Sequence, residues 1–327
     1  LDKINFEDGT VNCYGEIYPI KDTNLPTIDP SDPYKLSPEE EEVMVALEAS
    51  IANSKKLQEH INFLYTHGAL FTTYNGNLLF HGCIPFTEDG DFMEVTIAGK
   101  TNHGADLMRQ LDQELREVYF NPRCELDKAD AANLMWYLWL GPDSPLFGKD
   151  KMTTFERLFI ADKSTHKEHT VPYYKLIKNK DICIKIIRDF DLDPSKGIIL
   201  NGHVPVKIKD GESPIKGEGK LIVIDGGISK AYQKTTGIAG YTFIFNSWFM
   251  ALSEHEPYHP LQPDGTQEFK SPNIVTTHTL PERMLIIDTD IGKVLQSQID
   301  DLQQLNAEFR KGTIKEVYRS EEHTSEL

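Results

Sequence analysis

Long apolar runs are missing from this sequence. In 327 residues no stretch approaches the roughly 20 consecutive apolar residues that a membrane-spanning helix needs. The N-terminus also lacks the basic region and following apolar stretch of a signal peptide. Hydrophobic residues make up 39% of the chain and charged residues 26%, which is typical of a folded globular protein. The first residue is Leu1 rather than Met, so we expect a further segment upstream.

Positive charge and cysteine are also scarce. The chain has 34 Lys and Arg against 51 Asp and Glu, a formal net charge of -17. This balance argues against nucleic acid or an anionic membrane as the main partner, and a small phosphorylated substrate would need a metal ion or a local basic cluster. The four cysteines (Cys13, Cys83, Cys124 and Cys183) form no CxxC pair. We therefore predict reduced thiols in a cytoplasmic protein.

Several catalytic motifs are absent as well. The sequence contains no GxSxG, HExxH or GxGxxG, and Gly99-Lys100-Thr101 lacks the glycine five residues before the lysine of a P-loop. Two histidine pairs have spacings found in metal sites, but they lie in polar segments and are interpreted as ordinary surface residues: His166 with His169, and His255 with His259.

The hydrophobic pattern predicts an α/β protein. A capping box at Ser37 predicts a helix that continues to Gly68, and Asn75-Gly76 predicts a β-hairpin over 69–80. Further helices are predicted over 106–119, 129–140, 173–190 and 290–311, and buried strands over 197–200, 221–224 and 241–245. We expect residues 1–318 to form one partial domain. Residues 319–327 resemble a translated sequencing adapter and are treated as a foreign tail.

Two histidines follow predicted strands with the same local pattern. Leu78-Leu79-Phe80 leads into His81-Gly82, and Ile198-Ile199-Leu200 leads into Asn201-Gly202-His203. Each motif alone is more often structural. Together they support a shared metal site as well as they support two structural histidines, because ligands of open α/β sheets bind beyond the carboxyl ends of the strands.

Two loops are candidates for phosphate binding. Residues 144–157 are basic and rich in hydroxyls, and Lys149, Lys151 and Arg157 are the side chains we expect to hold sugar phosphates. A solvated loop leading into a helix is the alternative. The glycine-rich turn at Asp225-Gly226-Gly227, followed by Lys230 and Lys234, is interpreted as a plain strand-to-loop turn in preference to a phosphate site.

Three longer stretches carry a family resemblance. Residues 139–157, 201–207 and 224–233 resemble class 3 fructose-1,6-bisphosphatase, a bacterial branch of the calcineurin-like metallophosphoesterases. The resemblance implies a β-sandwich flanked by helices, with inserted helical segments, of which this chain is the C-terminal part. It also implies two metal ions, typically Mn²⁺, held by five motifs: DxH, GDxxDR, GNH[DE], a strand-end HG and a later GH. By this resemblance His81 and His203 are ligands of the same ion.

The chain departs from the family pattern in its first three motifs. It has no DxH, GDxxDR or GNH[DE], so we expect the bridging Asp, the ligand Asn and the catalytic His upstream of Leu1. The resemblance implies that the complete enzyme hydrolyses the 1-phosphate of fructose 1,6-bisphosphate to give fructose 6-phosphate in gluconeogenesis. We expect this chain alone to be inactive. The alternatives are a phosphoesterase of the same fold with another substrate, such as a phosphoprotein, and a non-catalytic binding or regulatory module. An oligomer is possible.

Overall fold

The computed structural model describes residues 3–121, 128–227, 229–237, 240–255, 262–265 and 273–314. The chain divides into two compact units, Leu1–Gly240 and Tyr241–Leu327. Its mixture of helices and several sheets confirms the predicted α/β class. Cys124, His259 and the expected boundary at 318/319 lie outside the described residues. In the part of the chain that is described, no helix is both long and apolar enough to cross a membrane.

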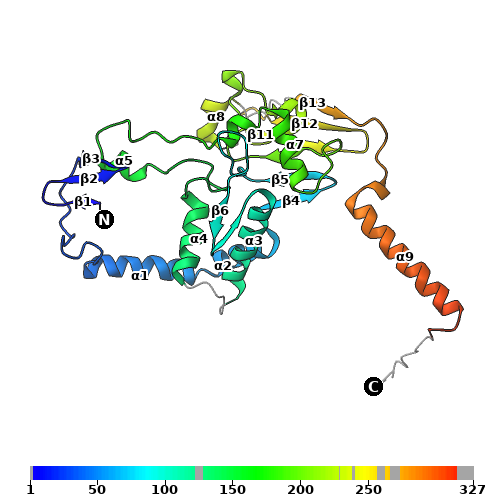
Figure 1. Cartoon of the computed structure of the whole chain (residues 1–327), viewed down its shortest axis with the longest axis horizontal. Coiled ribbons are helices and arrows are strands. Elements are labelled where there is room, and N and C mark those ends of the chain that lie inside the picture. The colour runs from blue at the N-terminus through cyan, green and yellow to red at the C-terminus, as the bar shows by residue number, and fades with distance from the viewer. Residues whose placement is uncertain are drawn as a thin grey trace. The chain divides into compact units, whose positions relative to one another are not determined.

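A five-stranded sheet forms the centre of the first unit (Figure 1). Its order is β4 (Phe71–Tyr74), β5 (Asn77–Phe80), β8 (Ile199–Asn201), β10 (Leu221–Val223) and β9 (Ile215–Lys216). The inner strands β5, β8 and β10 run parallel, and the edge strands β4 and β9 pair antiparallel. Parallel strands bury both faces, and Leu78, Ile199 and Ile222 have no exposed surface. The apolar runs found in the sequence therefore form the interior of this unit.

The first hairpin confirms its sequence prediction. β4 and β5 pair with Tyr74 opposite Asn77, leaving a two-residue turn at Asn75 and Gly76. Both turn residues have positive φ angles, 48° and 79°. Asn-Gly is the preferred pair for such a turn, whose twist matches that of the strands.

Along the chain, helices precede and follow the strands of this sheet. The longest is α3 (Gly104–Phe120), which corresponds to the helix predicted over 106–119 and buries Leu107, Met108 and Leu111 on one face. Other helical elements of this unit include α4 (Lys128–Leu140), α5 (Thr154–Phe159), η1 (Ile208–Asp210), η2 (Gly217–Gly219) and α8 (Lys230–Thr236). Smaller strands complete the unit: β1 (Ile4–Asn5), β2 (Thr10–Cys13) and β3 (Glu16–Pro19) in one antiparallel sheet, and β6 (Val95–Ile97) with β7 (Lys100–Asn102) in another.

Two helices predicted as continuous are each broken. The predicted helix from Ser37 to Gly68 is α1 (Pro38–Ala52) followed by α2 (Lys55–His67), and the hydroxyl of Ser54 accepts from the Leu57 amide to start the second. The predicted helix 173–190 is α6 (Tyr173–Leu176) followed by α7 (Lys180–Asp189). Asn179 caps α7, accepting from the Asp181 amide at 2.8 Å. In both, a small polar side chain binds the backbone in competition with helix continuation.

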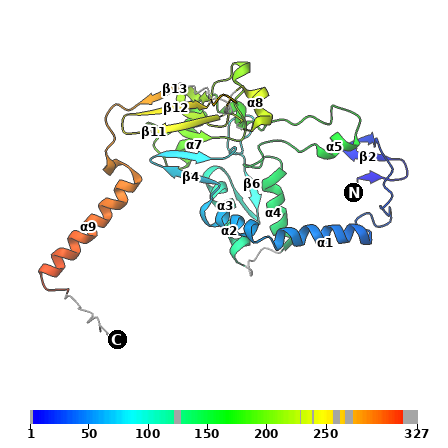
Figure 2. The same cartoon turned by 180° about the vertical axis from the view of Figure 1, so that it is seen from behind.

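The second unit contains one antiparallel sheet and one long helix. Strands β11 (Gly240–Phe245), β12 (Phe249–His255) and β13 (Asn273–Thr279) lie side by side in sequence order (Figure 2). A short turn, η3 (Ile286–Asp288), leads into α9 (Asp290–Arg310), which Thr289 caps through the Gly292 amide at 3.0 Å. Gly312 follows with a φ of 75°. The predicted strand at 241–245 and the predicted helix at 290–311 are both confirmed.

Because β8 is the central strand of the sheet, a substitution in it is expected to lower stability. Replacing Ile199 with Ala leaves a cavity in a fully buried site, and we expect the free energy of unfolding to fall by about 2–5 kcal/mol. Leu158→Ala is the control, because Leu158 is 63% exposed and its loss is expected to cost about 0.5 kcal/mol or less. Urea unfolding followed by circular dichroism measures both. Equal effects of the two substitutions would contradict the assignment of β8 to the core.

Candidate metal centre

The parallel strands β5, β8 and β10 end at one edge of the sheet, and functional side chains follow directly. His81 comes after β5, Gly202 and His203 after β8, and Asp225 shortly after β10. His81 and His203 are 122 positions apart in the sequence, yet Nε2 of His81 lies 2.9 Å from Nδ1 of His203. The two ring centroids are 4.8 Å apart and the rings are tilted by 68°. The structure therefore brings together the two histidines that the sequence singled out.

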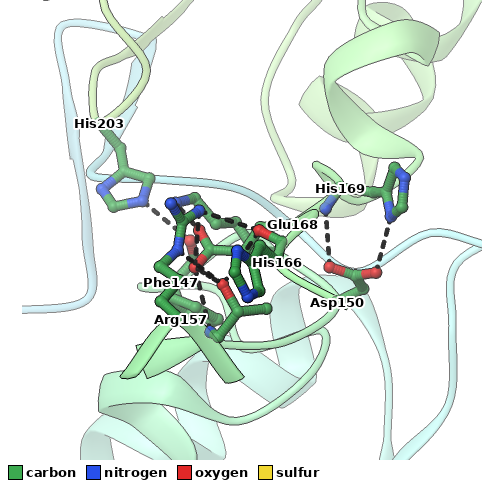
Figure 3. A network of polar contacts seen from close by, with 9 residues as sticks. Phe147, Asp150, Arg157, His166, Glu168, His169 and His203 are labelled. Atoms are coloured by element: carbon green, nitrogen blue, oxygen red, sulfur yellow. Dashed lines mark hydrogen bonds and ion pairs between the residues drawn. The ribbon is translucent and has the colours of Figure 1, made fainter. Parts of the chain in front are cut away.

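The second nitrogen of His203 is also engaged. Its Nε2 lies 2.9 Å from the carbonyl oxygen of Phe147, a contact drawn in Figure 3. Because a carbonyl only accepts, Nε2 carries the hydrogen and Nδ1 of the neutral ring is left as an acceptor. It follows that His81 donates from Nε2 to His203. A backbone carbonyl behind a ring nitrogen is the arrangement that orients histidines in metal sites.

Glycine at position 82 has a steric reason. A Cβ atom there would lie 2.4 Å from the carbonyl oxygen of Pro145, closer than carbon and oxygen can approach. That same carbonyl accepts from the Cys83 amide at 3.0 Å. At Gly202 the nearest atoms to an added Cβ are 3.7 Å away, so space does not demand glycine there. The His-Gly pattern after β5 thus reflects close contact with the segment 144–148.

The environment of His81 favours the uncharged form of its ring. Burial lowers the pKa of His81 below its ordinary value, and the neighbouring His203 lowers it further, while Asp225 acts in the opposite direction. Neutral imidazole is the form that binds metal ions.

A largely apolar cavity of about 600 Å³ adjoins the pair. Both histidines line it, together with Leu70, Leu115, Leu138, Trp139, Leu146, Phe147 and Met152 among others. Arg116 is its basic residue, but the guanidinium is already bound by Asp112 at 2.9 Å and by the carbonyls of Tyr65 and Gly68. Because each nitrogen of the Arg116 guanidinium already binds a protein acceptor and the rest of the lining is largely apolar, this cavity offers little to a phosphate group.

The two rings fit part of a metal site. Two nitrogens bound to one ion at about 2.1 Å and at a right angle would lie about 3 Å apart, close to the separation of the His81 and His203 nitrogens. Among the residues that the structure describes, no group of three or more His, Cys, Asp and Glu side chains is placed to hold an ion. Hard divalent ions take about six ligands, mainly oxygen. The described residues therefore offer two ring nitrogens, fewer than such an ion takes.

Comparison with known proteins identifies the family. The family model for "Firmicute fructose-1,6-bisphosphatase" matches residues 1–311. The chain belongs to this fructose-1,6-bisphosphatase family. Proteins named fructose-1,6-bisphosphatase class 3 are 50% identical over 318 residues in Clostridium tetani (strain Massachusetts / E88) and 49% identical over 319 residues in Clostridium botulinum (strain 657 / Type Ba4). Each alignment covers 97% of this chain and 48% of the relative, so the chain spans about half the length of these curated relatives. No solved structure matches.

The three basic residues predicted to hold sugar phosphates contact other protein groups in this member of the fructose-1,6-bisphosphatase family. Lys149 forms an ion pair with Glu168 at 2.7 Å, and Arg157 donates to the carbonyl of His166 at 3.0 Å (Figure 3). Nζ of Lys151 lies 3.9 Å from the centroid of the Tyr14 ring. The structure brings Lys149 and Arg157 to the same carboxylate and leaves Lys151 on another partner. Their role with sugar phosphates stays a prediction.

The remaining sequence candidates have ordinary partners. Asp225 accepts from the Gly227 amide at 2.8 Å, which is the bond of a plain Asx turn. His166 contacts the Ile160 carbonyl, His169 binds Asp150 and His255 contacts Thr242.

Sequence reasoning missed the group behind His203. Phe147 contributes its backbone carbonyl, a group that every residue has. Its residue type therefore gives no indication of this contact. The only signal was the Pro145 to Gly148 turn within a stretch already noted for its basic residues. The ligand motifs of the fructose-1,6-bisphosphatase family likewise contain the metal ligands and not the groups that orient them.

Glu168 gives this region a pH dependence. The hydrogen bond from Lys149 is the main cause that lowers its pKa to about 2 from an ordinary 4.5, and burial opposes the change. The folded state thus favours the carboxylate, and its contribution to stability is complete above pH 4.5 and is lost as the pH falls toward 2. We expect the difference in unfolding free energy between wild type and Glu168→Gln to shrink over that range. Urea unfolding at pH 6, 4.5 and 3 measures it.

The control for this experiment is Glu88→Gln, because Glu88 is exposed. Its difference from wild type is expected to stay flat. A Glu168→Gln difference that does not change with pH would contradict the role of the Lys149 pair.

Proposed function

We propose that the full-length protein containing this chain hydrolyses the 1-phosphate of fructose 1,6-bisphosphate to fructose 6-phosphate. The proposal is supported by the family match and by relatives that bear this name. In it, the chain is the C-terminal part of a calcineurin-like metallophosphoesterase that acts in gluconeogenesis in the cytoplasm. The partner is a small phosphorylated sugar. The acidic chain gives no support to nucleic acid or membrane as partners.

In this proposal His81 and His203 bind the same divalent ion, Mn²⁺, one of two in the complete site. The observation that carries it is the 2.9 Å contact between two ring nitrogens delivered by parallel strands, with the outer nitrogen of His203 held by a carbonyl. When bound, the metal ions would neutralise phosphate charge and make a water molecule acidic enough to attack phosphorus.

The two rings differ in whether the nitrogen that faces the other ring carries the hydrogen, and therefore in whether that nitrogen can bind an ion. His203 already presents the lone pair of Nδ1 toward His81, and the Phe147 carbonyl keeps its ring in place. In His81 the hydrogen is on Nε2. It has to move to Nδ1 before Nε2 can bind an ion. Both rings are neutral in this arrangement, so the phosphate charge has to be met by the metal ions and by basic groups.

The other ligands and the general acid belong, in this proposal, to the half of the relatives' length that the chain does not span. Lys149, Lys151 and Arg157 remain the side chains proposed for the sugar phosphates. Each now contacts a protein group, which is Glu168, the Tyr14 ring or the His166 carbonyl.

Two alternatives remain distinct from this proposal. A phosphoesterase of the same kind acting on a phosphoprotein is less favoured, because the relatives are named for a sugar bisphosphate. A non-catalytic module is the other. A reading frame upstream of Leu1 that encodes GDxxDR and GNH[DE] would exclude that module.

Activity and metal content test the proposal together. In the full-length protein we expect His81→Ala and His203→Ala each to lower kcat/KM for fructose 1,6-bisphosphate by about 100-fold or more and to reduce bound Mn²⁺. His169→Ala is the matched control, since this histidine binds Asp150, and it is expected to keep both. Steady-state kinetics and elemental analysis are the measurements.

This chain alone, with Mn²⁺ and the same substrate, is expected to show no turnover above a His81→Ala sample. Turnover above that control would contradict the assignment of essential groups to the unspanned half. Full activity of both histidine variants in the full-length protein would contradict the metal assignment.

A further inference from the structure

Asn201 is a buried polar residue next to the histidine pair. It is the last residue of β8, stands two positions before His203, and is only 1% exposed. Its Nδ2 donates to the carbonyl of Gly82 at 3.0 Å and to the hydroxyl of Tyr173 at 2.9 Å. Gly82 directly follows His81. The side chain thus links the residue after one histidine to the strand that leads into the other.

A second bond runs beside the first. The amide of Gly202 donates to the carbonyl of His81 at 2.9 Å. Regular pairing between β5 and β8 extends only to Leu79 opposite Leu200. Beyond that pair, consecutive residues of one segment, Asn201 and Gly202, bind consecutive carbonyls of the other, at Gly82 and His81. The Asn201 side chain therefore extends the strand pairing up to the histidines.

The histidines need such support. His203 has a φ of 67°, in the left-handed region that non-glycine residues rarely adopt, at a cost of about 1–2 kcal/mol. The ring-to-ring hydrogen bond contributes only about 0.5–1.5 kcal/mol. That contribution is comparable to the backbone cost, so the contact of His203 with the Phe147 carbonyl and the bonds at Asn201 and Gly202 add to the support of this conformation.

The amide of Asn201 has one defined orientation. The atom that faces the Gly82 carbonyl must be a donor, so it is the nitrogen. The amide oxygen is buried and, within the described part of the chain, has no hydrogen-bond partner. Such an acceptor costs about 1–3 kcal/mol. An apolar side chain of similar size would avoid this cost, so packing alone does not account for an asparagine here.

We propose that Asn201 is a positioning residue, which sets the separation of His81 and His203 by clamping the Gly82 carbonyl. The inference rests on the proposed function, in which the two rings share one ion. Asn201 itself contacts neither the ion nor the substrate. Its effect passes through the main chain at Gly82 to His81, and along β8 to His203.

Two substitutions remove the clamp in the full-length protein. Asn201→Asp keeps the shape but replaces the donor with an acceptor, and Asn201→Leu removes all polar atoms at similar size. For both we expect Mn²⁺ affinity to fall about 10- to 100-fold, the typical effect of losing a group that orients a ligand, with kcat/KM falling in parallel. Isothermal titration with Mn²⁺ gives the affinity without reference to activity.

Tyr173→Phe is the matched control. It removes the other partner of the same Nδ2 and leaves the bond to Gly82. We expect a loss of unfolding free energy, because Tyr173 is fully buried, but a change in Mn²⁺ affinity below threefold. Equal losses of affinity in Tyr173→Phe and the Asn201 variants would mean that Asn201 acts through general stability, and would overturn the proposal.

A measurement on the wild-type full-length protein covers the case in which neither Asn201 variant folds. Titration with diamagnetic Zn²⁺ is expected to shift the ¹⁵N-labelled side-chain amide of Asn201, because metal binding tightens the segments that the amide joins. An unmoved Asn201 signal while the His81 and His203 rings shift would overturn the proposal.

The outcomes separate the two hypotheses. If His81→Ala and His203→Ala leave Mn²⁺ affinity unchanged, the proposed function fails whatever Asn201 does. If those variants lose the ion while folded Asn201 variants bind it within threefold of wild type, only the positioning role fails.

Discussion

The parallel pairing of β5 with β8 is the constraint on which the rest of the first unit depends. It joins segments 122 positions apart, and fully buried Leu78 and Ile199 lie opposite each other in its register. Parallel strands point their carboxyl ends to the same edge, so residues that follow them meet in space. The region between the strands includes α3, α4 and α7, which the pairing has to accommodate. A shift of one residue would turn every side chain of the shifted strand to the opposite face and separate the rings.

The sequence was informative where one residue type has one structural meaning. The Asn75-Gly76 turn, the Ser37 capping box and the apolar strand runs were each predicted from local chemistry and are present. It was less informative at Ser54 and Asn179, where a capping residue inside an apolar pattern breaks a helix. A single polar residue in a periodic stretch is compatible with either outcome, since tertiary contacts decide which one occurs.

The candidate site shows the same division. His81 and His203 were found because a strand-end histidine beside glycine is an uncommon pattern, yet neither the Phe147 carbonyl nor the amide of Asn201 could be identified that way. Backbone carbonyls carry no side-chain signature. In the sequence, Asn201 is distinguished only as the first residue of the Asn201-Gly202-His203 motif. Supports of this kind become visible only when the distances between separate segments are known.

Charge explains why a pair of neutral rings needs other groups. In a chain with a net charge of -17, an anionic phosphate meets a repulsive field unless positive charge is concentrated nearby. Lys149 and Arg157 share the Glu168 carboxylate, Arg116 binds Asp112, and neutral imidazoles add nothing. A divalent ion concentrates charge in a way that flexible lysines do not. Burial and the neighbouring His203 lower the pKa of His81, which favours the neutral form of the ring that binds a metal ion, and a neutral ligand leaves the ion's full charge available to the phosphate.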